Sequence, residues 1–202
     1  MAEHPPREEH WYLLPAAVAV VSRCYSAAIL LALHSIPGMR PSLLTVWDAA
    51  WYLRIPDSGY HGGVVHGGHD FAFFPAWPLL IKIASLGIFP LPETGFVLAN
   101  GLFVVAAVLI WRVLADRLDA ATATAGVVLL AFAPSAYVFS LPYAEALFLV
   151  AAGSYFFVRP ESPWRLAATA FAMFTRIAGA GLVSSALARA AMTRGRARLA
   201  AL

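Results

Sequence analysis

Six apolar stretches occupy most of this 202-residue chain: residues 13–34, 74–90, 96–113, 120–139, 143–158 and 166–187. A helix that crosses the hydrocarbon core of a bilayer needs about 20 mostly apolar residues. Hydrophobic residues make up 61% of the sequence and charged residues only 12%, too few charges to cover a water-soluble protein of this size. The sequence therefore predicts an all-α, polytopic transmembrane helix bundle that forms one membrane domain over residues 1–202.

Charge and cysteine content exclude several classes of protein. The net charge is +3, and the basic residues do not form a stripe with exposed aromatic residues, so no nucleic-acid partner is expected. The one cysteine, Cys24, permits neither an intramolecular disulfide nor a cysteine-based zinc site. The first stretch is long, contains Arg23 and lacks a clear cleavage site, so we interpret it as a retained helix rather than a signal peptide.

The orientation of the bundle depends on two weak stretches. If the N-terminus is cytoplasmic and the six spans simply alternate in direction, the arginine-bearing loops after 96–113 and 143–158 lie outside the cell. This orientation goes against the positive-inside tendency. The stretch 74–90 contains Pro75, Pro78 and Lys82, and a half-inserted or re-entrant form of it moves both loops to the cytoplasm. The arginines of the tail, 188–202, then lie outside unless 166–187 is irregular too.

One long loop, residues 35–73, separates the first two stretches and is rich in aromatic residues. Long loops inside compact folds are usually functional. Its central part, TVWDAAWYLRI, has apolar residues near helical spacing beside two tryptophans, which favours a short helix at the membrane interface. We expect this loop on the non-cytoplasmic side.

Asp48 is the first candidate for chemistry, because it lies in this loop among aromatic side chains. An aspartate in that setting can act as a general base beside surfaces on which a sugar ring stacks. The alternative is that Asp48 only caps the short helix and that the aromatic residues form an interfacial belt. The aromatic candidates for substrate contact are Trp47, Trp51, Tyr52, Tyr60 and, further along the chain, Tyr143. Asp57 is a further carboxylate without an assigned role.

Charged residues at membrane depth form a second group, because they are costly there unless they are functional or paired. Glu145 opens an apolar span, where it either orients a substrate or only favours the first turn of a helix. Arg176 and Arg23 either bind a phosphate or form salt bridges, for instance to Glu145 or Asp48. Lys82 and Arg54 are weaker phosphate candidates, and snorkelling is the simpler explanation for Lys82.

The stretch from His61 to Asp70 holds three histidines and a carboxylate, enough in kind to bind zinc. Its spacing matches no ordered metal motif, so a solvated loop is the favoured interpretation and no metal or other cofactor is predicted. Asn100, a polar residue within an apolar stretch, favours a helix–helix hydrogen bond over a ligand contact.

Four motifs in order, WDAAWYLRIPDSGY, FAFFPAWPLL, PSAYVFSLPYAEALF and FTRIAG, resemble the PIG-V family of mannosyltransferases. The resemblance extends from about residue 42 to about residue 181. It implies a GT-C-like membrane enzyme that passes mannose from a polyprenyl phosphate carrier to a glycolipid or protein acceptor, on the non-cytoplasmic face. In a bacterium this would be the plasma membrane and the acceptor a component of the cell envelope.

The resemblance also implies roles for individual residues. GT-C enzymes carry acidic catalytic residues in the first outer loop, and Asp48 matches that position. Arg176, with Lys82 and Arg54 behind it, would meet the prenyl phosphate, while Glu145 and Tyr143 would line the sugar or acceptor pocket. Members of the family have further spans after the Thr-Arg motif, so the resemblance implies an N-terminal portion or a truncated member.

A second interpretation belongs to another class: a non-catalytic membrane module, or a transporter fragment, that binds lipid or a partner subunit. It predicts that Asp48 tolerates replacement by Asn or Ala. A transporter is expected to show internal repeats, and the long loop has no counterpart in the second half of the sequence.

Overall fold

The computed structural model describes residues 10–36, 43–61, 64–65, 68–159 and 162–199, and these are mainly helical. The six longer helices that run along the bundle are α1 (Leu13–His34), α4 (Leu91–Ala115), α5 (Ala120–Phe132), α6 (Glu145–Phe157), α7 (Pro163–Thr175) and α8 (Ala180–Leu199). The shorter elements are η1 (Leu43–Thr45), α2 (Asp48–Ser58), β1 (Val64–Val65), β2 (Gly68–His69), η2 (Asp70–Ala72), α3 (Ala76–Ser85), η3 (Pro134–Phe139) and η4 (Ile177–Gly179). The two strands pair antiparallel, with Val64 opposite His69.

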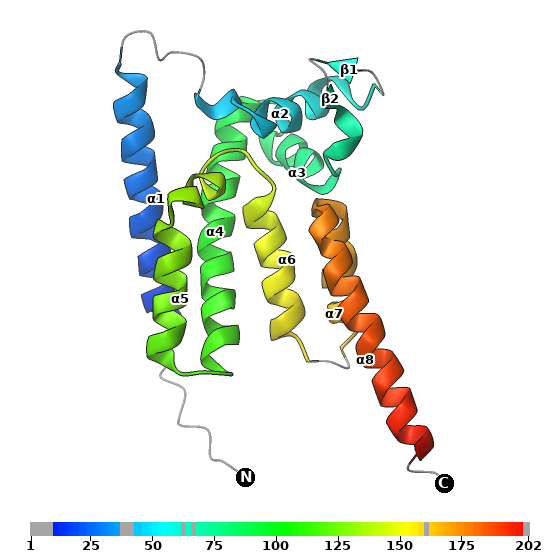
Figure 1. The fold of residues 1–202 in the computed structure, drawn as a ribbon. Helices are drawn as coiled ribbons and strands as arrows, with labels where there is room; N and C mark the ends of the chain where they lie inside the picture. Colours follow the sequence, from blue (N-terminus) through cyan, green and yellow to red (C-terminus); the bar gives the residue numbers. More distant parts are fainter. Residues whose placement is uncertain (1–9, 37–42, 62–63, 66–67, 160–161, 200–202) are drawn as a thin grey trace.

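The two ends of the bundle differ in structure (Figure 1). Helices α2 and α3 and the β1–β2 hairpin gather at one end, which we name the loop end. The first turn of α1 and the last turn of α8 lie at the opposite end, which we name the terminal end. Successive long helices therefore alternate in direction between the two ends, from α1 through α4, α5, α6, α7 and α8.

Two helices, α1 and α4, are long and apolar enough to cross a membrane by length and composition. Only 17% of the apolar 18-residue part of α1, and 28% of that of α4, is buried inside the bundle. Most residues of these two helices are therefore not buried. Helices α5, α6 and α7 have 13 residues each, about 20 Å of helix, which is less than the roughly 30 Å of a hydrocarbon core. The structure thus supports full-length spans for two of the six predicted segments.

The prediction of a span over 74–90 is wrong. The helix there, α3, has only ten residues and lies at the loop end beside α2 (Figure 1). It ends where Leu86 and Gly87 both adopt positive φ angles, 53° and 67°, a left-handed backbone that cannot continue an α-helix. The alternative interpretation, that this proline-containing stretch does not cross the bilayer, agrees with the structure.

The prediction of one continuous span over 166–187 is also wrong. Helix α7 ends at Thr175, Arg176 is extended, and η4 turns the chain back into α8. Gly179 makes this reversal sterically feasible, because a Cβ atom there would lie 2.5 Å from the backbone of Ala172. As a result, the arginine-rich sequence up to residue 199 forms the last part of α8, which runs toward the terminal end.

The core consists of several apolar clusters, of which the one at the loop end positions the candidate site. It joins α2, α3 and α4 to the segment that precedes α6, and its members include Tyr52, Trp77, Ile81, Leu141 and Tyr143. A second cluster around Phe103 and Trp111 holds α1, α4 and α5 together. The short helix predicted in the long loop is present as α2.

Candidate active site at the loop end

The segment between α5 and α6, residues 133–144, carries Tyr143 and leads directly into Glu145. Arg23 of α1 fixes its first half. The guanidinium donates to the carbonyl oxygens of Ala131 (3.1 Å) and Ala136 (3.1 Å) and to the Ser140 hydroxyl (2.8 Å). It also lies 4.3 Å from the centre of the Phe103 ring, a cation–π contact. Arg23 thus supplies a donor to Ala131, a carbonyl in the last turn of α5, and another to Ala136 in η3.

Ser140 and Pro142 attach the second half of this segment to α4 and α3. The Asn100 amide donates to the Ser140 carbonyl oxygen, and the Ser140 hydroxyl donates to the Asn100 side-chain oxygen, both at 3.2 Å. The indole of the buried Trp77 donates to the Pro142 carbonyl oxygen at 2.9 Å. Gly95 admits the proline ring closely, since a Cβ there would lie 2.7 Å from Pro142 Cβ. These contacts hold Tyr143 and Glu145 in place.

Glu145 and Arg176 form an ion pair between the first turn of α6 and the break after α7. An Arg176 nitrogen donates to Glu145 Oε1. The other oxygen, Oε2, is buried and has no hydrogen-bond partner among the described residues. The Arg176 side chain remains 35% exposed, so part of its guanidinium can still reach a ligand. The pair therefore offers one carboxylate oxygen and several N–H donors to whatever enters the site.

Asp48 lies in the first turn of α2, near the same pair. Its side chain is exposed and caps no backbone N–H of that helix, so the simple capping interpretation is wrong. Trp47, just before it, adopts φ 50°, an uncommon and costly backbone conformation for a non-glycine residue. The exposed Trp47 ring lies against Tyr137 of η3, 6.0 Å between centroids.

Two buried tyrosines, Tyr52 and Tyr143, show that these charges converge. Burial raises the pKa of Tyr52 above its usual value, the Glu145 and Asp48 charges raise it further, and the Arg176 charge opposes them. Burial also raises the pKa of Tyr143 to about 12, and the Asp48 charge adds to this effect. The Tyr143 hydroxyl donates to the Val46 carbonyl oxygen at 3.4 Å. Both phenols therefore stay protonated at neutral pH. The Tyr52 hydroxyl can donate to a ligand, whereas the single O–H of Tyr143 is engaged by Val46 and its oxygen can accept.

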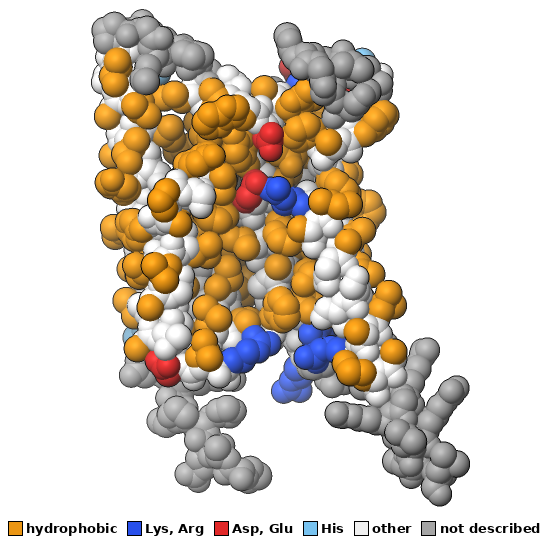
Figure 2. Space-filling view, in the orientation of Figure 1, with side chains coloured by type: hydrophobic (Ala, Val, Ile, Leu, Met, Phe, Trp, Pro, Cys, Tyr) orange, Lys and Arg blue, Asp and Glu red, His pale blue; other side chains and the backbone are white. Residues whose placement is uncertain are grey.

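The space-filling view shows how charged side chains are distributed over one face of the molecule (Figure 2). Acidic and basic side chains lie together toward the loop end of a face that is otherwise largely apolar. A separate group of basic side chains lies at the terminal end. Two carboxylates and one arginine beside two protonated phenols can accept a proton, hold a phosphate and bind hydroxyl groups.

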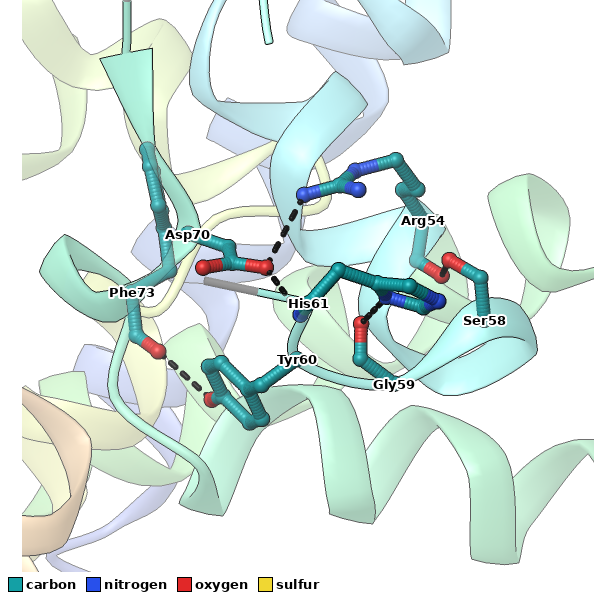
Figure 3. Close-up of polar contacts among 7 residues, drawn as sticks. All are labelled: Arg54, Ser58, Gly59, Tyr60, His61, Asp70 and Phe73. Atoms are coloured by element: carbon teal, nitrogen blue, oxygen red, sulfur yellow. Dashed lines mark hydrogen bonds and ion pairs between the residues drawn. The ribbon is translucent and has the colours of Figure 1, made fainter. Parts of the chain in front are cut away.

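Arg54 belongs to a second polar cluster, in which the fully buried Asp70 is central (Figure 3). Asp70 Oδ2 accepts from Arg54 at 3.3 Å and from the His61 backbone N–H at 2.7 Å. The Tyr60 hydroxyl donates to the Phe73 carbonyl oxygen at 2.6 Å. Arg54 also lies over the Trp51 ring, 5.0 Å from its centre. This cluster ties the end of α2 to η2 and so shapes the loop beside the site.

Comparison with protein families decides the identity of the chain. The family model described as Mannosyltransferase (PIG-V) matches residues 16–196. The chain belongs to this family. The comparisons with curated proteins and with solved structures give no match.

Membership of the mannosyltransferase (PIG-V) family confirms the resemblance stated from the four motifs. It indicates that the reaction is glycosyl transfer of mannose, and therefore that a sugar donor and an acceptor take part. The family is membrane-associated, in agreement with the apolar helices α1 and α4.

Within this mannosyltransferase-family chain, the predicted site residues fall into two groups and one outlier. Asp48, Tyr52, Tyr143, Glu145 and Arg176 converge at the loop end, and Trp47 lies there too, next to Asp48 in sequence. Arg54, Trp51 and Tyr60 belong to the Asp70 cluster. Lys82 is exposed in the last turn of α3, and its ammonium forms no hydrogen bond or ion pair with the described residues.

Two sequence interpretations need correction or remain outside the structure. The predicted salt bridge of Arg23 to Glu145 or Asp48 is wrong within the described part of the chain, because the partners of Arg23 there are carbonyl and hydroxyl oxygens. A phosphate at Arg23 stays a prediction. The zinc hypothesis concerned the stretch 61–70, of which residues 62–63 and 66–67 lie outside the described residues. Asn100 makes a structural hydrogen bond as predicted, although to the 133–144 segment rather than to another helix.

Sequence reasoning missed the residues that support the site. Asp70 was considered only as a metal ligand, and Trp77, Gly95 and Ser140 were not singled out. The motifs FFPAWPLL and SLPYAE are both rich in proline and aromatic residues. In the structure the Trp77 indole of the first donates to the Pro142 carbonyl oxygen of the second. Their shared composition is the signal from which a pairing of the two motifs could have been proposed.

Proposed function

We propose that this chain transfers mannose from a polyprenyl phosphate mannose donor to a hydroxyl group of a glycolipid or protein acceptor, with inversion at the anomeric carbon. The single observation that carries the proposal is the convergence of Asp48, Glu145 and Arg176 at one end of an otherwise apolar bundle. The reaction needs a base, a cation for the leaving phosphate and polar groups for the sugar, and these three side chains supply that set.

Asp48 is the proposed general base. It removes the proton of the acceptor hydroxyl while that oxygen attacks the anomeric carbon, and the bond from this carbon to the phosphate oxygen breaks. The polyprenyl phosphate leaves with the bonding electrons. Support comes from the position of Asp48: its carboxylate is exposed and caps no backbone N–H of α2, so it is free for a substrate proton.

Arg176 is the proposed phosphate ligand. Arginine presents several N–H donors in a planar fork, keeps its charge in apolar surroundings and fits phosphate oxygens in pairs. Glu145 Oε1 engages one of its nitrogens, which orients the guanidinium and leaves other N–H groups for the leaving phosphate. The negative charge that develops on this phosphate is thereby stabilised in the transition state.

Glu145 Oε2 is the proposed acceptor for a sugar hydroxyl. A buried carboxylate oxygen without a hydrogen bond is costly, and a ligand hydroxyl would remove that cost. Tyr52, a neutral donor, would bind a further hydroxyl oxygen, and the Tyr143 oxygen would accept from another hydroxyl. The exposed rings of Trp47 and Tyr60 offer stacking surfaces for sugar rings. The Trp51 ring already stacks on Phe73 and contacts Arg54, so we assign it to shaping the loop beside the site.

The distribution of arginines supports an orientation with the site on the non-cytoplasmic side. Basic residues concentrate at or toward the terminal end, in Arg112, Arg117, Arg159, Arg165 and Arg189. Cytoplasmic ends of membrane proteins carry such an excess. Helix α3 stays at the loop end, and the chain reverses after Arg176. Six helices then run between the two ends of the bundle, and their alternation places all of these arginines and the tail on one side.

The test is transfer of labelled mannose from polyprenyl phosphate mannose into lipid and protein fractions by membranes that contain the chain. We expect transfer by the wild type and its loss in Asp48→Asn at equal levels of inserted protein. Asp57→Asn is the matched control, since Asp57 is an exposed carboxylate at the other end of the same helix. Equal transfer in Asp48→Asn and Asp57→Asn contradicts the assignment of the base.

Stable insertion of a wild type that transfers no mannose contradicts the proposed function of this chain and favours the non-catalytic alternative, a membrane module that binds lipid or a partner subunit. The assay therefore separates the two classes of function directly.

A further inference from the structure

A separate cavity lies between α4 and α6, away from the proposed active site. Its volume is about 300 Å³, and its lining residues are Ile110, Val113, Leu114, Arg117, Leu149, Ala152, Gly153 and Phe156. Phe156 lies 11 residues beyond Glu145 on α6, about 16 Å along the helix axis. The cavity therefore belongs to the half of the bundle nearer the terminal end and shares none of the site residues.

The lining is apolar except for one cation. Aliphatic and aromatic side chains form the walls, and the small residues Ala152 and Gly153 line the α6 side, where Gly153 packs closely against Leu109. The Arg117 guanidinium stands 5.5 Å from the centre of the Phe156 ring and donates one N–H to the Val113 carbonyl oxygen. Arg117 is exposed, and it forms no ion pair within the described part of the chain. One arginine thus marks the polar edge of an apolar recess.

We infer that this cavity binds an acyl chain of an anionic phospholipid, with the lipid phosphate at Arg117. The apolar walls match a hydrocarbon chain, and the exposed cation at the edge matches a negatively charged headgroup. Basic residues at the cytoplasmic ends of membrane helices attract anionic lipids, and basic pockets between such helices bind their headgroups. The inference needs only the membrane association of the chain and is independent of the proposed transfer reaction.

Arg112 provides a matched control for the charge. It lies near Arg117 at the end of α4, but its guanidinium pairs with Asp116 at 2.8 Å and it does not line the cavity. Replacing either arginine by glutamine removes the same charge from the same end of the bundle. Only Arg117→Gln removes a cation from the edge of the cavity.

The experiment is native mass spectrometry of the full chain in detergent with an equal mixture of phosphatidylglycerol and phosphatidylcholine that carry identical chains. The measured quantity is the ratio of the two single-lipid complexes. We expect the wild type to favour phosphatidylglycerol about fivefold, the contribution of one arginine near an anionic headgroup. Arg117→Gln should bind both lipids equally, and Arg112→Gln should keep the preference.

A third variant tests the cavity itself. Ala152→Leu fills part of the space, so binding of both lipids should fall while their ratio stays the same. Thermal unfolding of each variant checks that the bundle remains folded. The inference is overturned if Arg117→Gln keeps the preference, if Arg112→Gln loses it to the same extent, or if a folded Ala152→Leu protein binds as much lipid as the wild type.

Discussion

Arg23 and Arg176 are two arginines of the predicted apolar stretches, and the structure uses them differently. Arg23 is almost completely buried, and its two terminal nitrogens donate to backbone carbonyls and hydroxyls of its own chain, while its Nε has no partner among the described residues. Arg176 pairs with a carboxylate and stays partly exposed in a break between helices. Charge at membrane depth is therefore no sufficient sign of a ligand site, and the state of the donor groups distinguishes the two positions.

The two regions are also connected. Arg23 holds Ala136 and Ser140, and the segment that contains them continues into Tyr143 and Glu145. Through this segment, Arg23 helps to position the Glu145 carboxylate, which in turn orients Arg176. We therefore expect substitution of Arg23 to reduce folding and substitution of Arg176 to reduce mannose transfer.

The largest expected effect is that of Arg23→Met on stability. The substitution leaves buried carbonyl oxygens and the Ser140 hydroxyl without their charged donor, at a cost of about 3–5 kcal/mol. The amount of folded protein after detergent extraction and its thermal unfolding temperature measure this cost. Arg23→Lys keeps the charge and one donor, so it should recover part of the stability; a fully stable Arg23→Met protein would show that the network contributes little.

Arg176→Gln should act on transfer rather than on folding. Loss of a charged donor to the leaving phosphate typically lowers turnover by about 100- to 1,000-fold. Initial rates of mannose transfer measure the effect, with Arg159→Gln, an exposed arginine in the α6–α7 connection, as control. Normal transfer by Arg176→Gln would leave the ion pair with Glu145 as a purely structural contact.

Gly179→Ala sharpens the comparison by moving Arg176 without removing it. The added Cβ would lie 2.5 Å from the backbone of α7, so the turn must shift, at a cost of about 1–3 kcal/mol. We expect lower stability together with reduced transfer. Gly181→Ala is the matched control, because a Cβ at that position meets nothing within 4 Å. Similar behaviour of the two variants would contradict the role assigned to the turn.

Tyr143→Phe has the smallest expected effect on folding. Its hydroxyl makes one long hydrogen bond, to Val46, which is worth about 0.5–1.5 kcal/mol at most. Because the Tyr143 pKa is raised to about 12, its phenol stays neutral well above pH 7, and no loss of stability from its ionisation is expected between pH 6 and about pH 10. Unfolding curves over this range check both statements; a stability loss centred near pH 9 would contradict the second.

Hydropathy was sufficient to predict the helices but not the two breaks. The first stretch, 13–34, matches α1, because a long apolar run without helix breakers has one stable form in a bilayer. The stretch 166–187 looks continuous, yet it reverses after Arg176 because Gly179 packs against Ala172, a contact that a hydropathy pattern does not contain. The prolines of 74–90 did signal the second break, since proline cannot continue a regular helix.

The charged residues of the site could be chosen from the sequence, but not their partners. Glu145 and Arg176 were candidates because ionisable residues are rare in apolar runs. Two of the four hydrogen-bond partners of Arg23 are backbone carbonyls, which every residue has, so no side-chain pattern could reveal those two. The burial of Asp70 likewise depends on Arg54 and on the His61 backbone, which only the folded loop brings together.

The most direct test of the central claim is mannose transfer by a protein in which the ion pair is reversed, Glu145→Arg combined with Arg176→Glu. The two charges still attract each other in this double variant, so thermal unfolding should return toward the wild-type temperature from the lower values of the single variants. We predict that mannose transfer nevertheless remains absent, because the cation and the free carboxylate oxygen have exchanged places relative to Asp48. Transfer at the wild-type rate by the reversed pair would show that Glu145 and Arg176 only hold the helices together.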